Sequence, residues 1–210
     1  MRHSRQHDGP GERDAREFEF AHRRHINLPV IAVVTRWIRP RRLAGATRPI
    51  GLDPIAGVPI GEIGLDFKFN RDKKQTDIFK SMLKLAEEID RPVIVHSRGA
   101  EKEVLDVLKK FDLNVVMHCF SGDLNLINKQ YYYSIPVSVV ERKWVQELAK
   151  KVDANNILTE SDSPYVIFKK RKSRPEDVKE ALKKISEIKE ISLDKIKDTI
   201  FTNYTSVFHE

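Results

Sequence analysis

From Val58 onward, short apolar runs alternate with amphipathic stretches of helical period. The apolar runs have the length of buried strands, and the stretches between them place apolar residues three or four positions apart. This alternation is typical of repeated βα units and predicts a parallel sheet covered by helices. The expected strands are Pro59–Leu65, Pro92–Val95, Val115–Met117, Tyr132–Val140 and Ile157–Thr159.

The stretches between the expected strands predict helices that each bury one apolar stripe. Two further helices are expected after the last strand. One begins near Pro175, which is followed by two acidic residues in the favourable first turn, and the other runs from Ser192 as N-cap towards Phe208. The stripes of the first three helices are Ile78, Met82, Leu85, Ala86 and Ile89, then Val104, Leu108 and Phe111, then Trp144, Val145, Leu148 and Val152.

The number of strands sets the fold class. Five expected strands, with Leu28–Val34 as a candidate sixth, are fewer than the eight strands of a closed βα barrel. The 210 residues also fall short of the roughly 250 residues of a typical complete barrel. We therefore predict an α/β, TIM-barrel-like fold that is incomplete at its N-terminus.

The basic residues change in type along the chain. Residues 1–67 contain 11 Arg and no Lys, whereas residues 68–210 contain 6 Arg and 21 Lys. The start of the chain also lacks apolar periodicity, and prolines and glycines interrupt its later part. We expect an atypical, largely irregular Arg-rich segment over 1–57, for which our hypothesis is a separate coding origin, and one globular domain over 58–210.

Composition narrows the classes of function. The single cysteine, Cys119, excludes an internal disulfide and a multi-cysteine zinc cluster, and we expect it to be a buried residue without nucleophilic function. A net charge of +7 fits nucleic acid, phosphorylated metabolites or an ordinary basic surface. No apolar run is long enough to span a membrane and no secretory signal is evident. We expect a cytoplasmic protein, and of the oligomeric states, which the sequence leaves open, we favour a monomer.

Side chains of the types that can bind a metal lie at or near the carboxyl ends of the expected strands. Glu62, His96, His118 and Asp162 all fall at or near the carboxyl end of a strand. These ends converge on one rim of a parallel barrel, so the four side chains are expected to meet there. Two imidazoles and two carboxylates form a site for Zn²⁺, Mn²⁺ or Mg²⁺. Taken singly, each residue has an alternative structural explanation, such as a hydrogen-bonded histidine or a turn-capping carboxylate.

Four segments around these residues resemble, in order and spacing, the motifs of the TatD family of metal-dependent deoxyribonucleases. The resemblance covers about residues 58–210, and it implies an amidohydrolase-type TIM barrel with a divalent-metal centre that cleaves phosphodiester bonds in DNA. It also implies that Glu62, His96, His118 and Asp162 are metal ligands. The four segments are Gly61-Glu62-Ile63-Gly64-Leu65-Asp66-Phe67, Arg91-Pro92-Val93-Ile94-Val95-His96-Ser97-Arg98, His118-Cys119-Phe120-Ser121-Gly122 and Thr159-Glu160-Ser161-Asp162-Ser163-Pro164-Tyr165.

One family feature is absent from this sequence. Family members begin with a strand ending in His-x-His, which supplies two ligands, and no such triplet occurs in this chain. The resemblance therefore implies one complete cation site, formed by Glu62, His96 and His118. A second site would retain only Glu62 and Asp162.

The expected reaction is phosphodiester hydrolysis by a metal-activated water. Glu62 and Asp162 are the candidate catalytic residues, with Asp162 orienting the water or taking its proton. Arg98 is a candidate phosphate contact, although a surface ion pair with Glu101 explains it equally well. Without the His-x-His pair we expect reduced activity. Two alternatives stay open: a non-catalytic remnant that binds metal or nucleic acid, and a hydrolase of another ester, such as aminoacyl-tRNA.

Overall fold

The computed structural model describes residues 58–68 and 70–208. The expected sixth strand at residues 28–34 and the whole Arg-rich segment lie outside these residues. The strands of the main sheet are β1 (Ile60–Asp66), β2 (Val93–Arg98), β3 (Val115–His118), β4 (Tyr132–Pro136) and β5 (Ile157–Glu160). The helices are α2 (Lys73–Glu88), α3 (Glu101–Leu108), α4 (Lys143–Lys151), α5 (Val178–Lys189) and α6 (Leu193–Phe208).

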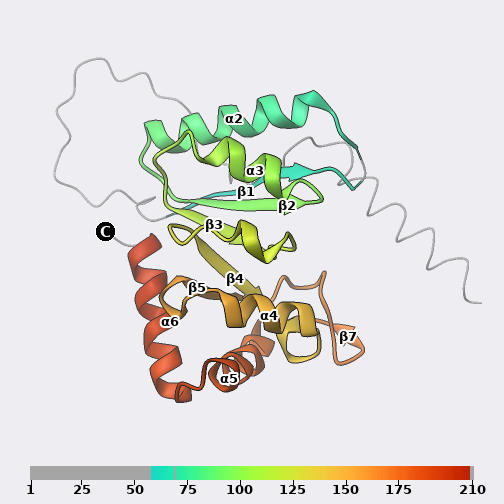
Figure 1. Ribbon diagram of the computed structural model, residues 1–210, viewed down its shortest axis with the longest axis vertical. Coiled ribbons are helices and arrows are strands. Elements are labelled where there is room, and N and C mark those ends of the chain that lie inside the picture. Colours follow the sequence, from blue (N-terminus) through green and yellow to red (C-terminus); the bar gives the residue numbers. More distant parts are fainter. Residues whose placement is uncertain (1–57, 69, 209–210) are drawn as a thin grey trace, which may run out of the picture.

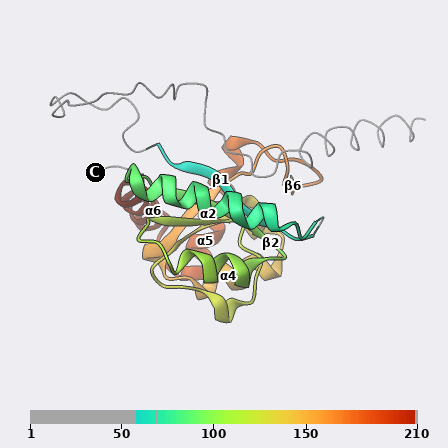
Figure 2. The ribbon, with the colours of Figure 1, turned by 90° about the horizontal axis from the view of Figure 1, so that it is seen from above.

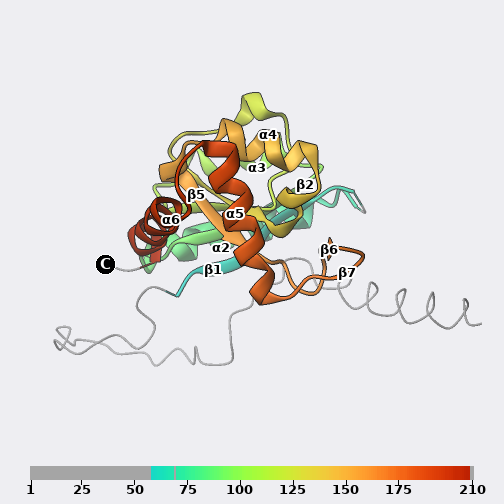
Figure 3. The ribbon, with the colours of Figure 1, turned by 90° about the horizontal axis from the view of Figure 1, so that it is seen from below.

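The five strands form one parallel sheet in the order β1-β2-β3-β4-β5, so every strand pairs with the next strand along the chain. This arrangement confirms the predicted βα units (Figure 1). Viewed from the α2 side, α2 lies over β1 (Figure 2), and from the opposite side α5 and α6 lie nearest, beside β5 (Figure 3). Of the helices in the described ranges, none combines the length and the apolar character needed to cross a bilayer.

Alternation along the strands separates two faces of the sheet. One face carries the side chains that pack under the helices, among them Val95, Met117 and Ile135, which are fully buried. On the opposite face, a smaller cluster joins Val116 and Leu158 to the end of α6. Side chains two positions apart on a strand share a face, so His118 and Glu160 lie on the same face as Val116 and Leu158. This face is therefore apolar at the amino ends of the strands and polar at their carboxyl ends.

Two expectations about local structure are wrong. The run Tyr132–Val140 is a strand only to Pro136, and Val137–Val140 form a 3-10 turn that leads into α4. This turn is buried like a strand, which is why its apolar sequence resembles one. Trp144, expected on the buried stripe of α4, is 40% exposed. A short antiparallel hairpin, β6 (Ile167–Phe168) and β7 (Arg171–Lys172), was also not among the expected strands.

The last helix is fixed to the sheet by one buried amide. Asn203 donates two hydrogen bonds of 2.8 Å from its Nδ2, one to the carbonyl of Ala154 and one to that of Ile157. Asn203 therefore joins α6 to the start of β5 in the way that a backbone pairing would.

We expect Asn203→Ala to lower the free energy of unfolding by about 2 kcal/mol, because two carbonyls lose a buried donor. Asn155→Ala, at an exposed position nearby, should change it by less than about 0.5 kcal/mol. Urea denaturation of both variants measures the difference, and equal losses would contradict the role given to Asn203.

Candidate metal centre

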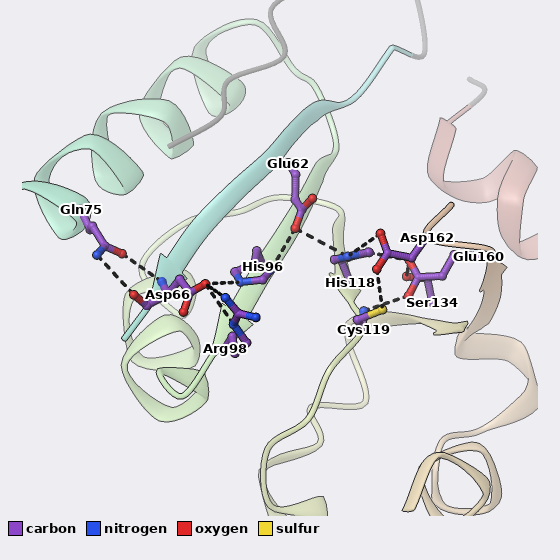
Figure 4. Close-up of polar contacts among 10 residues, drawn as sticks. All are labelled: Glu62, Asp66, Gln75, His96, Arg98, His118, Cys119, Ser134, Glu160 and Asp162. Atoms are coloured by element: carbon purple, nitrogen blue, oxygen red, sulfur yellow. Dashed lines mark hydrogen bonds and ion pairs between the residues drawn. The ribbon is translucent and has the colours of Figure 1, made fainter. Parts of the chain in front are cut away.

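The four side chains predicted as metal ligands lie at one end of the sheet (Figure 4). Glu62 extends from β1, His96 from β2 and His118 from the end of β3, while Asp162 follows β5. Between them, β4 contributes Ser134, which pairs in register with His118. Residues far apart in the sequence therefore meet because parallel strands end on the same rim.

Three of these side chains have the spacing that a single cation requires. Glu62 Oε1 lies 2.8 Å from His96 Nδ1 and 3.6 Å from His118 Nε2. Ligand atoms of all three residues lie within 4.8 Å of one another. Two ligand atoms on one tetrahedral zinc ion are about 3.3 Å apart, given metal–ligand distances near 2.0 Å. The donor set fits a divalent cation with little rearrangement.

Asp162 lies at the edge of this group. Its Oδ1 is 3.9 Å from His118 Nε2, the same ring nitrogen that faces Glu62. Asp162 is thus close to the three ligand candidates without contacting all of them.

The electrostatics of the cluster favour positive charge. Burial raises the pKa of Asp162, and repulsion from the carboxylates of Glu160 and Glu62 raises it further against the opposing charge of His118. Burial alone would lower the pKa of His118, but the hydrogen bond to Glu160 and the surrounding carboxylates raise it to about 9. Both shifts have the direction expected of a site with excess negative charge, as a cation site must have.

Comparison with known proteins identifies the family. The family model described as TatD related DNase matches residues 55–209 of this chain. This chain belongs to the TatD family.

The TatD relatives include curated proteins and solved structures. An uncharacterized metal-dependent hydrolase of Methanocaldococcus jannaschii is 38% identical over 154 residues, which cover 71% of this chain and 61% of that protein. The uncharacterized metal-dependent hydrolase YabD of Bacillus subtilis is 30% identical over 165 residues, with coverages of 72% and 65%. The crystal structure of YjjV, a TatD homologue from Escherichia coli K12, has a TM-score of 0.67 and 26% identity, and the match covers 72% of this chain and 64% of YjjV.

These matches bear on the fold and on its extent. They confirm the TIM-barrel-like α/β fold class, since TatD proteins are the solved neighbours of this sheet and its helices. They also show that this chain spans less than two thirds of the length of the TatD relatives named above.

Two residues of this TatD site, Glu160 and Ser134, were not predicted from the sequence. Glu160, at the end of β5, accepts a 2.5 Å hydrogen bond from His118 Nδ1 and a 2.6 Å bond from Ser134 Oγ on the same oxygen, Oε2. Its other oxygen accepts the backbone N–H of Cys119 at 3.0 Å. The carboxylate therefore fixes the His118 ring with Nε2 turned towards Glu62 and Asp162. A carboxylate behind a ligating histidine is a common way to orient the ring and raise its basicity.

Replacing Glu160 by Gln should weaken cation binding by about 10- to 100-fold while leaving the fold intact. The amide cannot accept all three hydrogen bonds with its NH₂ group in place of an oxygen, so the His118 ring loses its fixed orientation. Titration of the metal-free protein with Zn²⁺ or Mn²⁺ measures the loss. Glu101→Gln is the matched control, since Glu101 also accepts a serine hydroxyl, that of Ser121, outside the cluster. Equal affinities in the two variants would rule out the orienting role.

Arg98 is held at the rim by a carboxylate. Asp66 Oδ2 accepts its Nη2 at 2.6 Å and its Nε at 3.0 Å, and the same oxygen lies 3.5 Å from His96 Nε2. Although burial raises the pKa of Asp66, the hydrogen bond and charge of Arg98 hold it below its usual value. Asp66 thus holds the Arg98 guanidinium close to His96, one of the candidate cation ligands.

The glycine two residues after Glu62 lets β1 approach β2 closely. Gly64 pairs with His96 and has a φ of +147°, and a Cβ at this position would lie 1.9 Å from the His96 carbonyl oxygen. The pairing of β1 with β2 is irregular between Ile60 and Ile63, which is where Glu62 lies. The Gly-Glu-Ile-Gly sequence therefore sets the position of Glu62 relative to His96.

Cys119 follows His118 and lies beside the cluster, with ligand atoms of Cys119, His118 and Glu160 within 4.8 Å of one another. Its Sγ is 4.0 Å from Asp162 Oδ2. Burial raises the pKa of the thiol, and the negative charges of Glu160 and Asp162 raise it further. A thiol held protonated in this way is a poor nucleophile, as expected from the sequence. The expectation that Cys119 is buried is wrong, since the residue is only partly buried.

Proposed function

We propose that this chain is a metal-dependent phosphodiesterase that hydrolyses DNA. The observation that carries the proposal is the convergence of Glu62, His96 and His118 within ligand spacing at the carboxyl ends of three strands, with Asp162 beside them. The family description as a DNase and the net charge of +7 support an anionic nucleic-acid substrate.

Glu62, His96 and His118 would hold the cation, for which Zn²⁺, Mn²⁺ and Mg²⁺ are the candidates. When bound, a divalent cation lowers the pKa of water and polarises a phosphoryl oxygen. Asp162 is placed to orient the attacking water and to take its proton, and burial with like charges around it raises its proton affinity. Arg98, fixed by Asp66, presents N–H groups that suit a phosphate oxygen.

A nuclease assay tests the proposal. The full chain is stripped of metal with a chelator and incubated with single-stranded and nicked DNA, alone or with added Mg²⁺, Mn²⁺ or Zn²⁺. Cleavage that depends on the added cation is expected, and Glu62→Ala should abolish it. Cleavage that persists after chelation and in Glu62→Ala would refute the assignment.

The length of the chain keeps a second candidate in view. The chain spans less than two thirds of the relatives described above. Among the described residues, one set of three ligand candidates contains Glu62, and a second set, His118, Cys119 and Glu160, shares His118 with it. The second candidate is a remnant that binds a cation and nucleic acid but cleaves neither DNA nor an aminoacyl ester. In that case the purified protein should take up metal and show no turnover with any of the three cations.

A further inference from the structure

Three large hydrophobic side chains that the fold leaves exposed line one hollow. They are Trp144, Tyr165 and Ile167, which are 40%, 66% and 54% exposed. The hollow has a volume of about 480 Å³, within the range of small-molecule sites in proteins. Exposed apolar side chains that gather into one patch, instead of being scattered singly over the surface, mark a candidate binding site.

The hollow begins where the candidate metal centre ends. Cys119 lines it, and the same residue contacts Asp162 through Sγ and Glu160 through its backbone N–H. Tyr165 reaches the hollow from the loop that carries Asp162, and its N–H donates to the Asp162 carbonyl at 2.8 Å. A ligand in the hollow would therefore lie next to a ligand at the metal centre.

The chemistry of the lining selects a flat anionic ligand. Trp144 and Tyr165 offer aromatic faces, and Arg142 adds an exposed guanidinium beside them. Among the described residues that form the lining, none is acidic. Aromatic side chains and arginine together are the usual partners of bases and phosphates in single-stranded nucleic acid.

We propose that this hollow is the subsite for the nucleobase next to the scissile phosphate of single-stranded DNA. The inference rests on the proposed function, and it assigns the recognition of the neighbouring nucleotide to Trp144 and Tyr165. Stacking is tolerant of base identity, so the subsite favours unpaired strands without selecting a sequence.

Binding without metal separates this subsite from catalysis. The affinity of the full chain for labelled single-stranded oligothymidylate is measured in chelator by fluorescence anisotropy, beside an abasic strand with the same number of phosphates. Trp144→Ala and Tyr165→Ala should each weaken binding of the oligothymidylate by at least about fivefold and leave binding of the abasic strand unchanged. Phe201→Ala removes a ring that is 68% exposed on α6, away from the hollow, and should change neither affinity.

A spectroscopic signature gives an independent reading. The chain has two tryptophans, so Trp37→Phe leaves Trp144 as the sole tryptophan, whose emission can be excited selectively at the red edge of the absorption band. Its fluorescence should be quenched by oligothymidylate and not by the abasic strand. Equal losses for the two strands, or quenching by both, would overturn the subsite. Because these measurements exclude the cation, base-dependent binding without cleavage would refute the proposed function alone, and cleavage without base-dependent binding would refute the subsite alone.

Discussion

Replacing Glu62 by Gln is expected to lower the affinity for a divalent cation by more than about 100-fold and to abolish the proposed DNA hydrolysis. Loss of an outer carboxylate behind a ligand already costs 10- to 100-fold, and Glu62 is itself the residue that both histidines face. Although burial raises the pKa of Glu62, the hydrogen bond from His96 and the charges of His118 and Arg98 hold it below its usual value. Glutamine thus removes a full negative charge at neutral pH.

The measurement is a cation titration of the metal-free variant, followed by the nuclease assay with added Mn²⁺. Glu101→Gln serves as the control because it makes the same chemical change close to the rim, at a carboxylate that bonds to Gly99 and Ser121. Thermal unfolding of both variants shows whether the fold is retained. Parental cation affinity in a folded Glu62→Gln protein would contradict the role of Glu62 as the shared ligand.

The spacing of hydrophobic residues along the sequence predicts the strands and helices that bury one face. It was wrong for the run after Pro136, because an uninterrupted apolar run reports burial and not backbone conformation. It was also wrong for Trp144, which lies at the expected spacing yet occupies the first turn of α4, where the helix face turns towards the hollow.

The position of the candidate ligands followed from the order of the strands, since the carboxyl ends of parallel strands share a rim. Their orienting partners did not. Ser134 and Glu160 approach His118 only through the register of β3 with β4 and of β4 with β5, and sequence period does not fix register. The position of Glu160 two residues after Leu158 was the available signal, because both lie on β5 and residues two apart on a strand face the same side.

The same dependence on register makes Gly64 the position where a small substitution should do the most harm to the fold. Gly64→Ala should lower the free energy of unfolding by on the order of 3 kcal/mol, since the methyl group meets the His96 carbonyl at 1.9 Å and φ stays in a region that favours glycine. For a chain of this size, that loss corresponds to a fall in Tm of roughly 10 °C.

Gly99→Ala is the control that separates backbone strain from a steric clash. Gly99 also has a positive φ, +66°, but the atom nearest to the new Cβ would be 3.7 Å away. This control should lose only about 1 kcal/mol. Thermal and urea unfolding of the two variants give both values, and similar losses would mean that β1 can move away from β2 without cost. Cation titration of Gly64→Ala then shows whether displacing His96 also separates it from Glu62, as the close pairing of the two strands requires.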